Sequence, residues 1–167
     1  MRTEPKPDFL QILLVLTKHQ VKFIVVGGVS AVLQGAPFTT FDLDVVHSRD
    51  PENAGRLLRA LESLGAYYRT SPNKNIKPAE SHLLSPGHQL LMTNSGPLDI
   101  LGMIGRGQEY EELLAHTLKM EVAADVSVLV LDLKTLIQTK EEMAGEKDKA
   151  ILPLLRRTLE EKSPRKN

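Results

Sequence analysis

Aspartates stand inside two segments of this chain that otherwise have the pattern of β-strands. Residues 41–46 alternate in a way that places Asp42 and Asp44 on the same face of a strand. Asp99 lies inside a second apolar segment, residues 97–101. An unpaired carboxylate within a sheet costs several kcal/mol, and carboxylates that lie close together also repel one another. The chain therefore has to fold so that these charges are either exposed to water or compensated.

A divalent cation is one way to compensate such a cluster. Carboxylate oxygens suit Mg²⁺, with Mn²⁺ as a substitute, and Mg²⁺ takes further ligands from water and substrate phosphates. Two such ions about 4 Å apart can hold the attacking and the leaving oxygen of a phosphoryl displacement. The alternative is a solvated face, the usual explanation of two alternate aspartates on an edge strand. Because aspartate is depleted in strands, a third one on a second strand favours the metal site.

A pair of glycines marks the point where another strand is expected to end. Residues 21–26 form an apolar run rich in β-branched side chains, which predicts a buried strand. Gly27 and Gly28 follow, and a helical pattern begins directly after them. Glycine lets the backbone approach a ligand closely, and the N–H groups of a first helical turn point towards an anion, to which Ser30 would add a hydroxyl donor. Most Gly-Gly pairs only turn the chain, so the weight of this pair comes from the aspartate segment that follows.

The rest of the pattern predicts an α+β protein. We expect one domain over residues 1–167, with a core of about residues 9–131 and a C-terminal helical part over residues 132–160. Strands are expected over residues 21–26, 41–46, 89–93, 98–104, 118–122 and 126–131, and helices over residues 8–19, 29–35, 50–65, 109–115, 132–145 and 147–160.

One stretch has neither pattern. Residues 70–86 contain three prolines and many polar residues, which predicts a long loop or poorly paired strands. Loops of this length in compact domains are often functional. Arg69, Lys74 and Lys77 bring positive charge to this stretch and could meet an acidic acceptor such as RNA. The alternative is that these side chains are only solvated.

Composition narrows the class of protein. The formal net charge is zero, from 21 basic and 21 acidic residues, and only 4% of residues are aromatic, which argues against a dedicated nucleic-acid surface. The absence of cysteine excludes disulfides, thiolate metal sites and cysteine nucleophiles. No apolar run reaches the roughly 20 residues that cross a bilayer. We therefore expect a cytoplasmic protein with no membrane partner.

Together the motifs resemble those of the nucleotidyltransferase superfamily, which has the DNA polymerase β-like fold. That family carries Gly-Gly or Gly-Ser after a hydrophobic residue at a strand–helix junction, then Asp-hydrophobic-Asp, then a third carboxylate on a later strand. In this chain these are Val26-Gly27-Gly28, Asp42-Leu43-Asp44-Val45 and Asp99. The spacing and order extend the resemblance over about residues 9–160.

The chain looks most similar to small bacterial nucleotidyltransferase-like proteins akin to the AbiEii type IV toxins. The residues that carry this likeness are Thr39-Thr40-Phe41-Asp42-Leu43-Asp44, Leu136-Ile137-Gln138-Thr139-Lys140 and Gly145-Glu146-Lys147-Asp148. Glu146 departs from the pattern, because relatives often have arginine at that place. The departure replaces a cation that could face phosphates with an anion.

The resemblance implies a fold and a set of roles. The fold would be a mixed central β-sheet flanked by helices, with further helices at the C-terminus. The triphosphate would be held by backbone and side-chain groups of Gly27, Gly28 and Ser30. Mg²⁺ would be held by Asp42, Asp44 and Asp99, of which Asp99 would also help to deprotonate the acceptor hydroxyl. Phosphate charge near the leaving pyrophosphate would be neutralised by Lys140 and Lys147.

The expected function is therefore Mg²⁺-dependent transfer of a nucleoside monophosphate from an NTP, such as ATP, to a hydroxyl. The acceptor could belong to a protein, a tRNA or a small molecule, and the toxin-like resemblance adds a protein antitoxin as an expected partner. Two alternatives stay open. A catalytically degenerate protein that binds nucleotide or a protein partner is favoured by Glu146, and a metal-dependent phosphodiesterase would use the same carboxylates without the Gly27-Gly28 turn.

Overall fold

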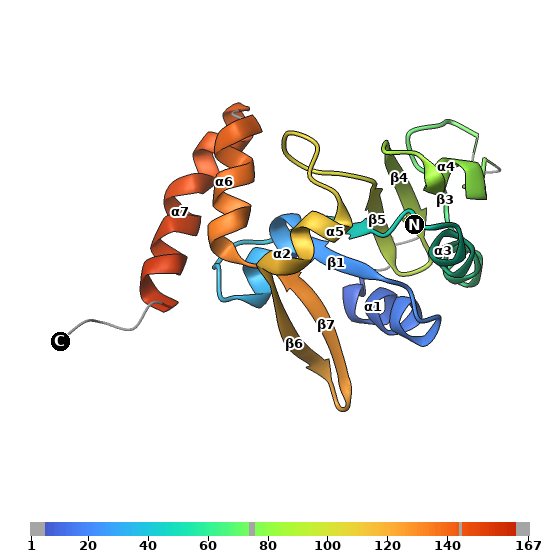
Figure 1. Ribbon diagram of the computed structural model, residues 1–167, viewed down its shortest axis with the longest axis horizontal. Helices are drawn as coiled ribbons and strands as arrows, with labels where there is room; N and C mark the ends of the chain where they lie inside the picture. Colours follow the sequence, from blue (N-terminus) through green and yellow to red (C-terminus); the bar gives the residue numbers. More distant parts are fainter. Residues whose placement is uncertain (1–5, 74–75, 144, 163–167) are drawn as a thin grey trace.

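The chain forms a mixed sheet of seven strands with helices on both faces (Figure 1). The computed structural model describes residues 6–73, 76–143 and 145–162. Within the last of these ranges, it describes the backbone of residues 146–148 but not their side chains. The strand order is β3-β4-β5-β2-β1-β7-β6. The strands are β1 (Phe23–Val26), β2 (Leu43–His47), β3 (Tyr67–Tyr68), β4 (His88–Thr93), β5 (Gly96–Leu101), β6 (Thr117–Ala123) and β7 (Val126–Leu131). The helices are α1 (Phe9–Lys18), α2 (Gly27–Leu33), α3 (Pro51–Ser63), α4 (Glu80–Leu84), α5 (Tyr110–Leu113), α6 (Leu133–Met143) and α7 (Glu146–Lys162), with a 3₁₀ turn at Leu114–His116.

The pairing of the central strands decides where the aspartates lie. β2 runs antiparallel to β1 and parallel to β5, and β1 runs parallel to β7. In the β2–β5 register Asp44 is the direct partner of Asp99. In the β1–β2 register Asp44 lies opposite Val26, the residue before the glycine pair. The sheet therefore brings the strand–helix junction and two of the three aspartates to one place.

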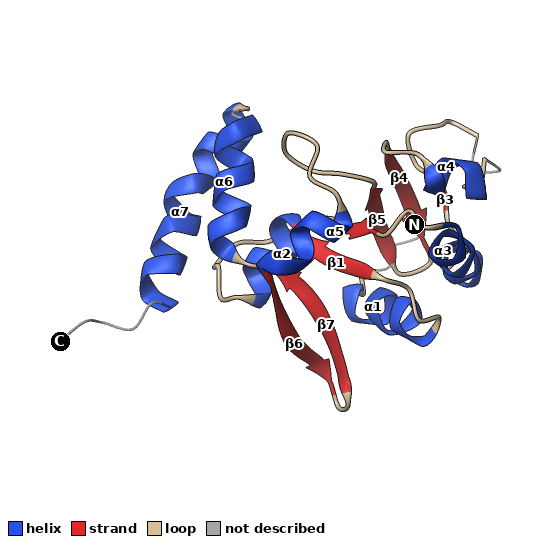
Figure 2. Cartoon of the chain, viewed as in Figure 1, coloured by secondary structure: helices blue, strands red, loops and turns tan. Residues whose placement is uncertain are grey.

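Alternation along the strands gives the sheet two apolar cores. Val25 and Val45 belong to a core that α1 and α3 cover, whereas Val26 and Val46 belong to one that α2, α5, α6 and α7 cover. Figure 2 shows the strands lying between these two groups of helices, with the β6–β7 hairpin projecting away from them. Asp44 has the same alternation as Val46, so the aspartates emerge on the face that α2 and α6 cover.

Helix starts follow the capping residues of the sequence. The carboxylates of Asp8, Asp50 and Asp132 each accept a backbone N–H from the first turn of α1, α3 and α6, respectively. The expected mixed sheet flanked by helices is confirmed.

Two expectations about local structure need correction. β2 begins at Leu43, so Asp42 lies just before the strand. Residues 70–86 are mainly loop, as one of the two alternatives predicted, but contain the short helix α4. Within the described ranges every helix is too short or too polar to traverse a lipid bilayer.

Candidate active site

Three carboxylates converge at the β2–β5 pair. Asp42 precedes β2, Asp44 lies in β2 and Asp99 lies in β5, and each contributes one oxygen to a group whose members are all within 4.8 Å of one another. Asp99 is buried, while Asp42 and Asp44 are half-buried. The structure thus brings together the residues that the sequence singled out as metal ligands, and their function as ligands remains a prediction.

Asp44 is the electrostatically extreme member of this group. Burial, followed by the neighbouring charges of Asp42 and Asp99, raises its pKa to about 8, and the opposing influence is the positive charge of Lys140. Its Oδ1 atom is buried and has no hydrogen-bond partner in the part of the chain that the structure describes. Burial, and then the charge of Asp99, also raises the pKa of Asp42. A carboxylate oxygen that the fold leaves without a donor is unusual and calls for an explanation.

Arg69 also belongs to this cluster. Its Nη1 donates to Asp99 Oδ1 and its Nη2 lies 3.7 Å from Asp42 Oδ2. The sequence placed Arg69 with the lysines of a loop and not in the site. The only local indication that Arg69 follows a strand was the aromatic pair Tyr67-Tyr68, which is typical of a strand and directly precedes the arginine. Of the two lysines, Lys74 lies outside the described residues and Lys77 is exposed.

The glycine pair is required by close approach to the aspartate segment. Gly27 has a φ of +64°, and a Cβ there would overlap Oδ2 of Asp44. A Cβ on Gly28 would lie 2.6 Å from Cγ2 of Thr40. Both contacts are much shorter than van der Waals distance, so the strand–helix turn can lie against the aspartate segment only because these side chains are absent.

Ser30 acts inside the turn. Its side chain is fully buried and its hydroxyl donates to the backbone carbonyl of Gly27 at 2.6 Å. In this structure the hydroxyl is used within the turn, and the expectation that Ser30 offers it to a phosphate stays a prediction. The helix that begins at this turn, α2, is short, with only 7 residues.

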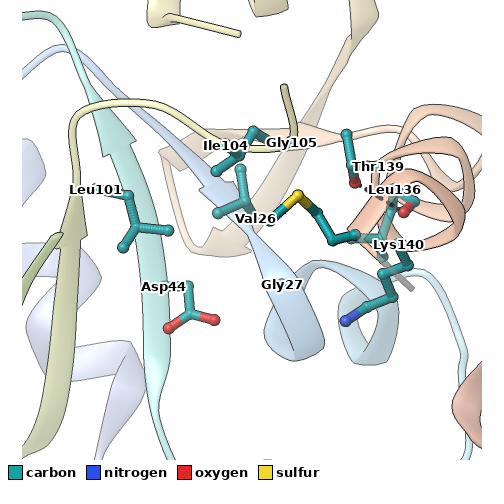
Figure 3. Close-up of a pocket in the computed structure, with 10 residues that line it drawn as sticks. Val26, Gly27, Asp44, Leu101, Ile104, Gly105, Leu136, Thr139 and Lys140 are labelled. Carbon is teal, nitrogen blue, oxygen red and sulfur yellow. Dashed lines mark hydrogen bonds between the residues drawn. The ribbon is translucent and has the colours of Figure 1, made fainter. Parts of the chain in front are cut away.

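A cavity of about 150 Å³ opens beside Asp44. Figure 3 shows Asp44 on one side of this pocket and Lys140 of α6 on the other, with Gly27 between them. The remaining lining is mostly apolar and includes Leu101, Ile104, Leu136 and Met143. The side chain of Lys147 lies outside the described residues, as do those of Glu146 and Asp148. Lys140 is therefore the one of the two predicted phosphate-neutralising lysines that the structure places at the pocket.

The donor set suits a hard divalent cation. Three carboxylates supply only oxygen ligands, which Mg²⁺ and Mn²⁺ prefer. Coordination of a cation would also satisfy Oδ1 of Asp44, which is buried without a hydrogen-bond partner among the described residues. The residues of the site thus fit the metal that the sequence predicted.

Comparison with known proteins identifies the fold. No protein-family model and no curated protein matches the chain. Among solved structures, a Thermotoga maritima protein provisionally described as a nucleotidyltransferase (TM1012) has 21% identity and a TM-score of 0.55, over 92% of this chain and 91% of its own. The lincomycin-bound lincosamide antibiotic adenylyltransferase LnuA has 13% identity and a TM-score of 0.62, over 91% of this chain and 98% of its own.

A third structure, ANT(2'')-Ia in complex with adenylyl-2''-tobramycin, has 15% identity and a TM-score of 0.56, over 90% of this chain and 87% of its own. None of the three bears on the narrower resemblance to the AbiEii toxins, which stays a prediction. All three match about nine-tenths of this chain. The chain therefore has the nucleotidyltransferase fold, as its motifs predicted.

Proposed function

We propose that this protein is a Mg²⁺-dependent nucleotidyltransferase that moves a nucleoside monophosphate from an NTP to a hydroxyl of a small molecule. The observation that carries the proposal is Asp44, whose buried Oδ1 has no partner although Asp42 and Asp99 lie beside it. The same pocket is lined by Gly27 and Lys140, so an anionic ligand would meet a bare backbone turn and a cation.

The residues divide the work of the reaction. Asp42, Asp44 and Asp99 would hold Mg²⁺, which when bound supplies positive charge to the phosphates and to the attacking oxygen. The Gly27 turn gives the triphosphate a surface without side chains, and Lys140 neutralises charge on the departing pyrophosphate.

The transfer needs no reactant besides the NTP and the acceptor. The acceptor oxygen bonds to the α-phosphorus, the bond from that phosphorus to the bridging oxygen of the β-phosphate breaks, and pyrophosphate leaves. The proton of the acceptor hydroxyl passes to Asp99. Positioning and charge neutralisation supply most of the catalysis in reactions of this kind, and the site is built from groups that do both.

The choice of a small-molecule acceptor rests on the structural neighbours. LnuA is an adenylyltransferase of lincosamide antibiotics, and ANT(2'')-Ia has been seen with an adenylylated tobramycin. ATP is therefore the first donor to test. Transfer to a protein or a tRNA, and pairing with an antitoxin, are further proposals that rest on the toxin-like sequence motifs alone.

The test is transfer of label from each of the four NTPs, labelled at the α-phosphate and supplied with Mg²⁺. The acceptors are lincomycin, tobramycin, total tRNA and a cell lysate separated into small-molecule and macromolecular fractions. Asp44→Asn is the inactive variant. Asp125→Asn is its matched control, because Asp125 is exposed in the β6–β7 turn with a φ of 60°, which asparagine tolerates.

We expect label in the small-molecule fraction with the unaltered protein and with Asp125→Asn, and its loss with Asp44→Asn or with EDTA. Label confined to tRNA or protein would overturn the choice of acceptor but not the transfer. Nucleotide binding without any labelled product would favour the catalytically degenerate alternative. Activity that survives Asp44→Asn would overturn the proposed site.

A further inference from the structure

Arg69 compensates the negative charge of two of the three carboxylates, and no described arginine lies against the third. Its guanidinium donates through Nη1 to Asp99 and faces Asp42 through Nη2 at 3.7 Å. Asp44 acts on Arg69 only through its charge, the smallest of the causes that raise the pKa of Arg69. Among the described residues, Oδ1 of Asp44 has no hydrogen-bond partner. One positive charge therefore lies against two of the carboxylates, and the third faces the pocket.

The position of this guanidinium is fixed by the sheet. The backbone N–H of Arg69 donates to the carbonyl of Leu90 at 3.1 Å, and Nη1 also donates to the carbonyl of Leu91 at 3.0 Å. The Arg69 side chain is 25% exposed and that of Asp99 is 10% exposed. An arginine anchored by backbone and side chain in this way differs from a solvated surface cation, since moving it would break hydrogen bonds to β4 as well as the ion pairs.

The charge of the cluster changes what a cation would meet. Three ionised carboxylates would carry three negative charges, and Arg69 cancels one of them next to Asp99. The strongest attraction for a divalent cation is then at Asp44. Asp42 comes next, because Arg69 lies closer to Asp99 than to Asp42. A second cation beside Asp99 would meet a positive charge within a few ångströms. Charges at such a separation repel strongly unless water lies between them.

From this geometry we infer that Arg69 takes the place of one of two divalent cations, so that the three carboxylates bind a single metal ion that lies closest to Asp44 and Asp42. This rests on the proposed function, because it concerns the same metal-binding carboxylates. Arg69 is accordingly a positioning residue that holds Asp99 and part of Asp42. A merely structural arginine would make the opposite prediction, since its removal would disorder the carboxylates and weaken metal binding.

The experiment uses Mn²⁺ as the probe and electron paramagnetic resonance as the readout, without catalysis. The full chain is titrated with Mn²⁺, alone and with an ATP analogue that has a methylene bridge between its α- and β-phosphates. The unaltered protein should hold one Mn²⁺ per chain with the spectrum of an isolated ion. Arg69→Gln should hold two ions with the spectrum of an exchange-coupled pair, and its first ion should bind about tenfold more tightly in the absence of nucleotide.

Two further variants separate charge from folding. Arg56→Gln is the matched control, because Arg56 also pairs with a carboxylate and its side chain is 24% exposed, but it lies on α3 away from the site. It should leave both the number and the affinity of Mn²⁺ unchanged. Arg69→Lys keeps the positive charge and should still exclude the second ion.

The role of Arg69 and the transferase proposal would be overturned by different outcomes. An exchange-coupled pair in the unaltered protein, or weaker Mn²⁺ binding in a folded Arg69→Gln variant, would overturn the role of Arg69 and leave the transferase proposal standing. If the unaltered protein bound no Mn²⁺ with or without the analogue, both would fail. Because the spectrum of the unaltered protein is decisive by itself, the test does not depend on the folding of any variant.

Discussion

β2 contains two buried titratable residues, Asp44 and His47, and the fold treats them in opposite ways. The Nδ1 atom of His47 lies 3.1 Å from the carbonyl oxygen of Leu101, and its Nε2 atom lies 2.7 Å from that of Leu83. Oδ1 of Asp44 has no partner. Burial is the largest cause of the pKa shift in both residues. It lowers the pKa of His47, and together with the charges of Asp42 and Asp99 it raises the pKa of Asp44 to about 8.

The difference separates a structural polar residue from a functional one. Burying a polar group is unfavourable unless a partner compensates it. Both ring nitrogens of His47 face carbonyl groups, one of β5 and one of α4. A neutral imidazole donates a hydrogen bond to one of them, so the ring links β2 to a neighbouring element. No described residue supplies a donor to Oδ1 of Asp44, and we propose that a ligand supplies the compensation.

Gly27→Ala should cause the largest loss of function. The new Cβ would overlap Oδ2 of Asp44, and the φ of +64° would strain the alanine. Displacing a catalytic group by about 1 Å can cost on the order of 100-fold in rate, so we expect kcat/KM for nucleotide transfer to fall by at least about that factor. Gly35→Ala is the control, because Gly35 also has a positive φ, of +100°, but a Cβ there meets nothing within 4 Å. Equal losses in the two variants would mean that backbone strain, and not the place of Asp44, explains the effect.

Asp44→Asn should stabilise the protein in the absence of metal, although it removes activity. The carboxyl group of Asp44 loses its proton near pH 3.8 in the unfolded chain and near pH 8 in the folded protein. Between these values the folded state binds more protons, so the free energy of unfolding falls as the pH rises.

Asparagine is neutral throughout, and the free energy of unfolding of the variant should therefore exceed that of the unaltered protein by up to about 5 kcal/mol near pH 8 and by little near pH 4. Urea unfolding in EDTA at these two pH values measures the difference. A gap of the same size at both would show that Asp44 is not the source of the pH dependence.

His47→Leu should destabilise the fold and leave the chemistry intact. The substitution removes the ring nitrogens that face the carbonyl groups of Leu83 and Leu101, which should lower the free energy of unfolding by about 1–2 kcal/mol. His88→Leu is the control, since the exposed His88 also contacts a carbonyl, that of Met103 at 3.2 Å, and should change stability little.

The pH dependence of this effect has a fixed sign. Because burial lowers the pKa of His47 below its usual 6.5, the unfolded chain binds the proton more tightly. Stability due to this residue should therefore be lost as the pH falls below about 6.5, and His47→Leu should lose less on acidification than the unaltered protein. A steeper acid dependence in the variant would contradict this assignment.

The contrast between Asp44 and His47 also shows what the sequence could predict. Asp42 and Asp44 could be placed because alternation on a strand is local, and the glycine junction because it interrupts an apolar run. Their pairing with Asp99 needed the β2–β5 register, which was expected only through the resemblance to a known fold. The role of Ser30 could not be decided from the sequence, because a hydroxyl near a turn can bond either to a ligand or to the turn itself, as it does with the carbonyl of Gly27.

Arg69 and His47 could not be placed in the same way, because their partners are distant in sequence. Arg69 contacts Asp99, 30 positions along the chain, and His47 contacts Leu101, 54 positions along. No periodicity reports such contacts, and a charged residue beside a polar loop is solvated more often than not. The composition of residues 70–86 therefore drew Arg69 into the loop, although its backbone continues the edge of the sheet.

Of these four substitutions, Lys140→Gln should have the smallest effect. It tests how far the region around Asp44 that lacks a compensating charge extends. The Lys140 charge opposes the rise in the pKa of Asp44 and lines the same pocket, so its loss should push that pKa higher and weaken NTP binding. Since Lys140 is half-buried, solvent screening limits the effect to about 1 kcal/mol, or about a fivefold rise in KM for the NTP. Lys134→Gln, an exposed lysine of the same helix, should leave KM unchanged. A fall in kcat at constant KM would instead place Lys140 on the reacting phosphate in the transition state, and the pocket between α2 and α6 would then belong to the chemistry and not only to binding.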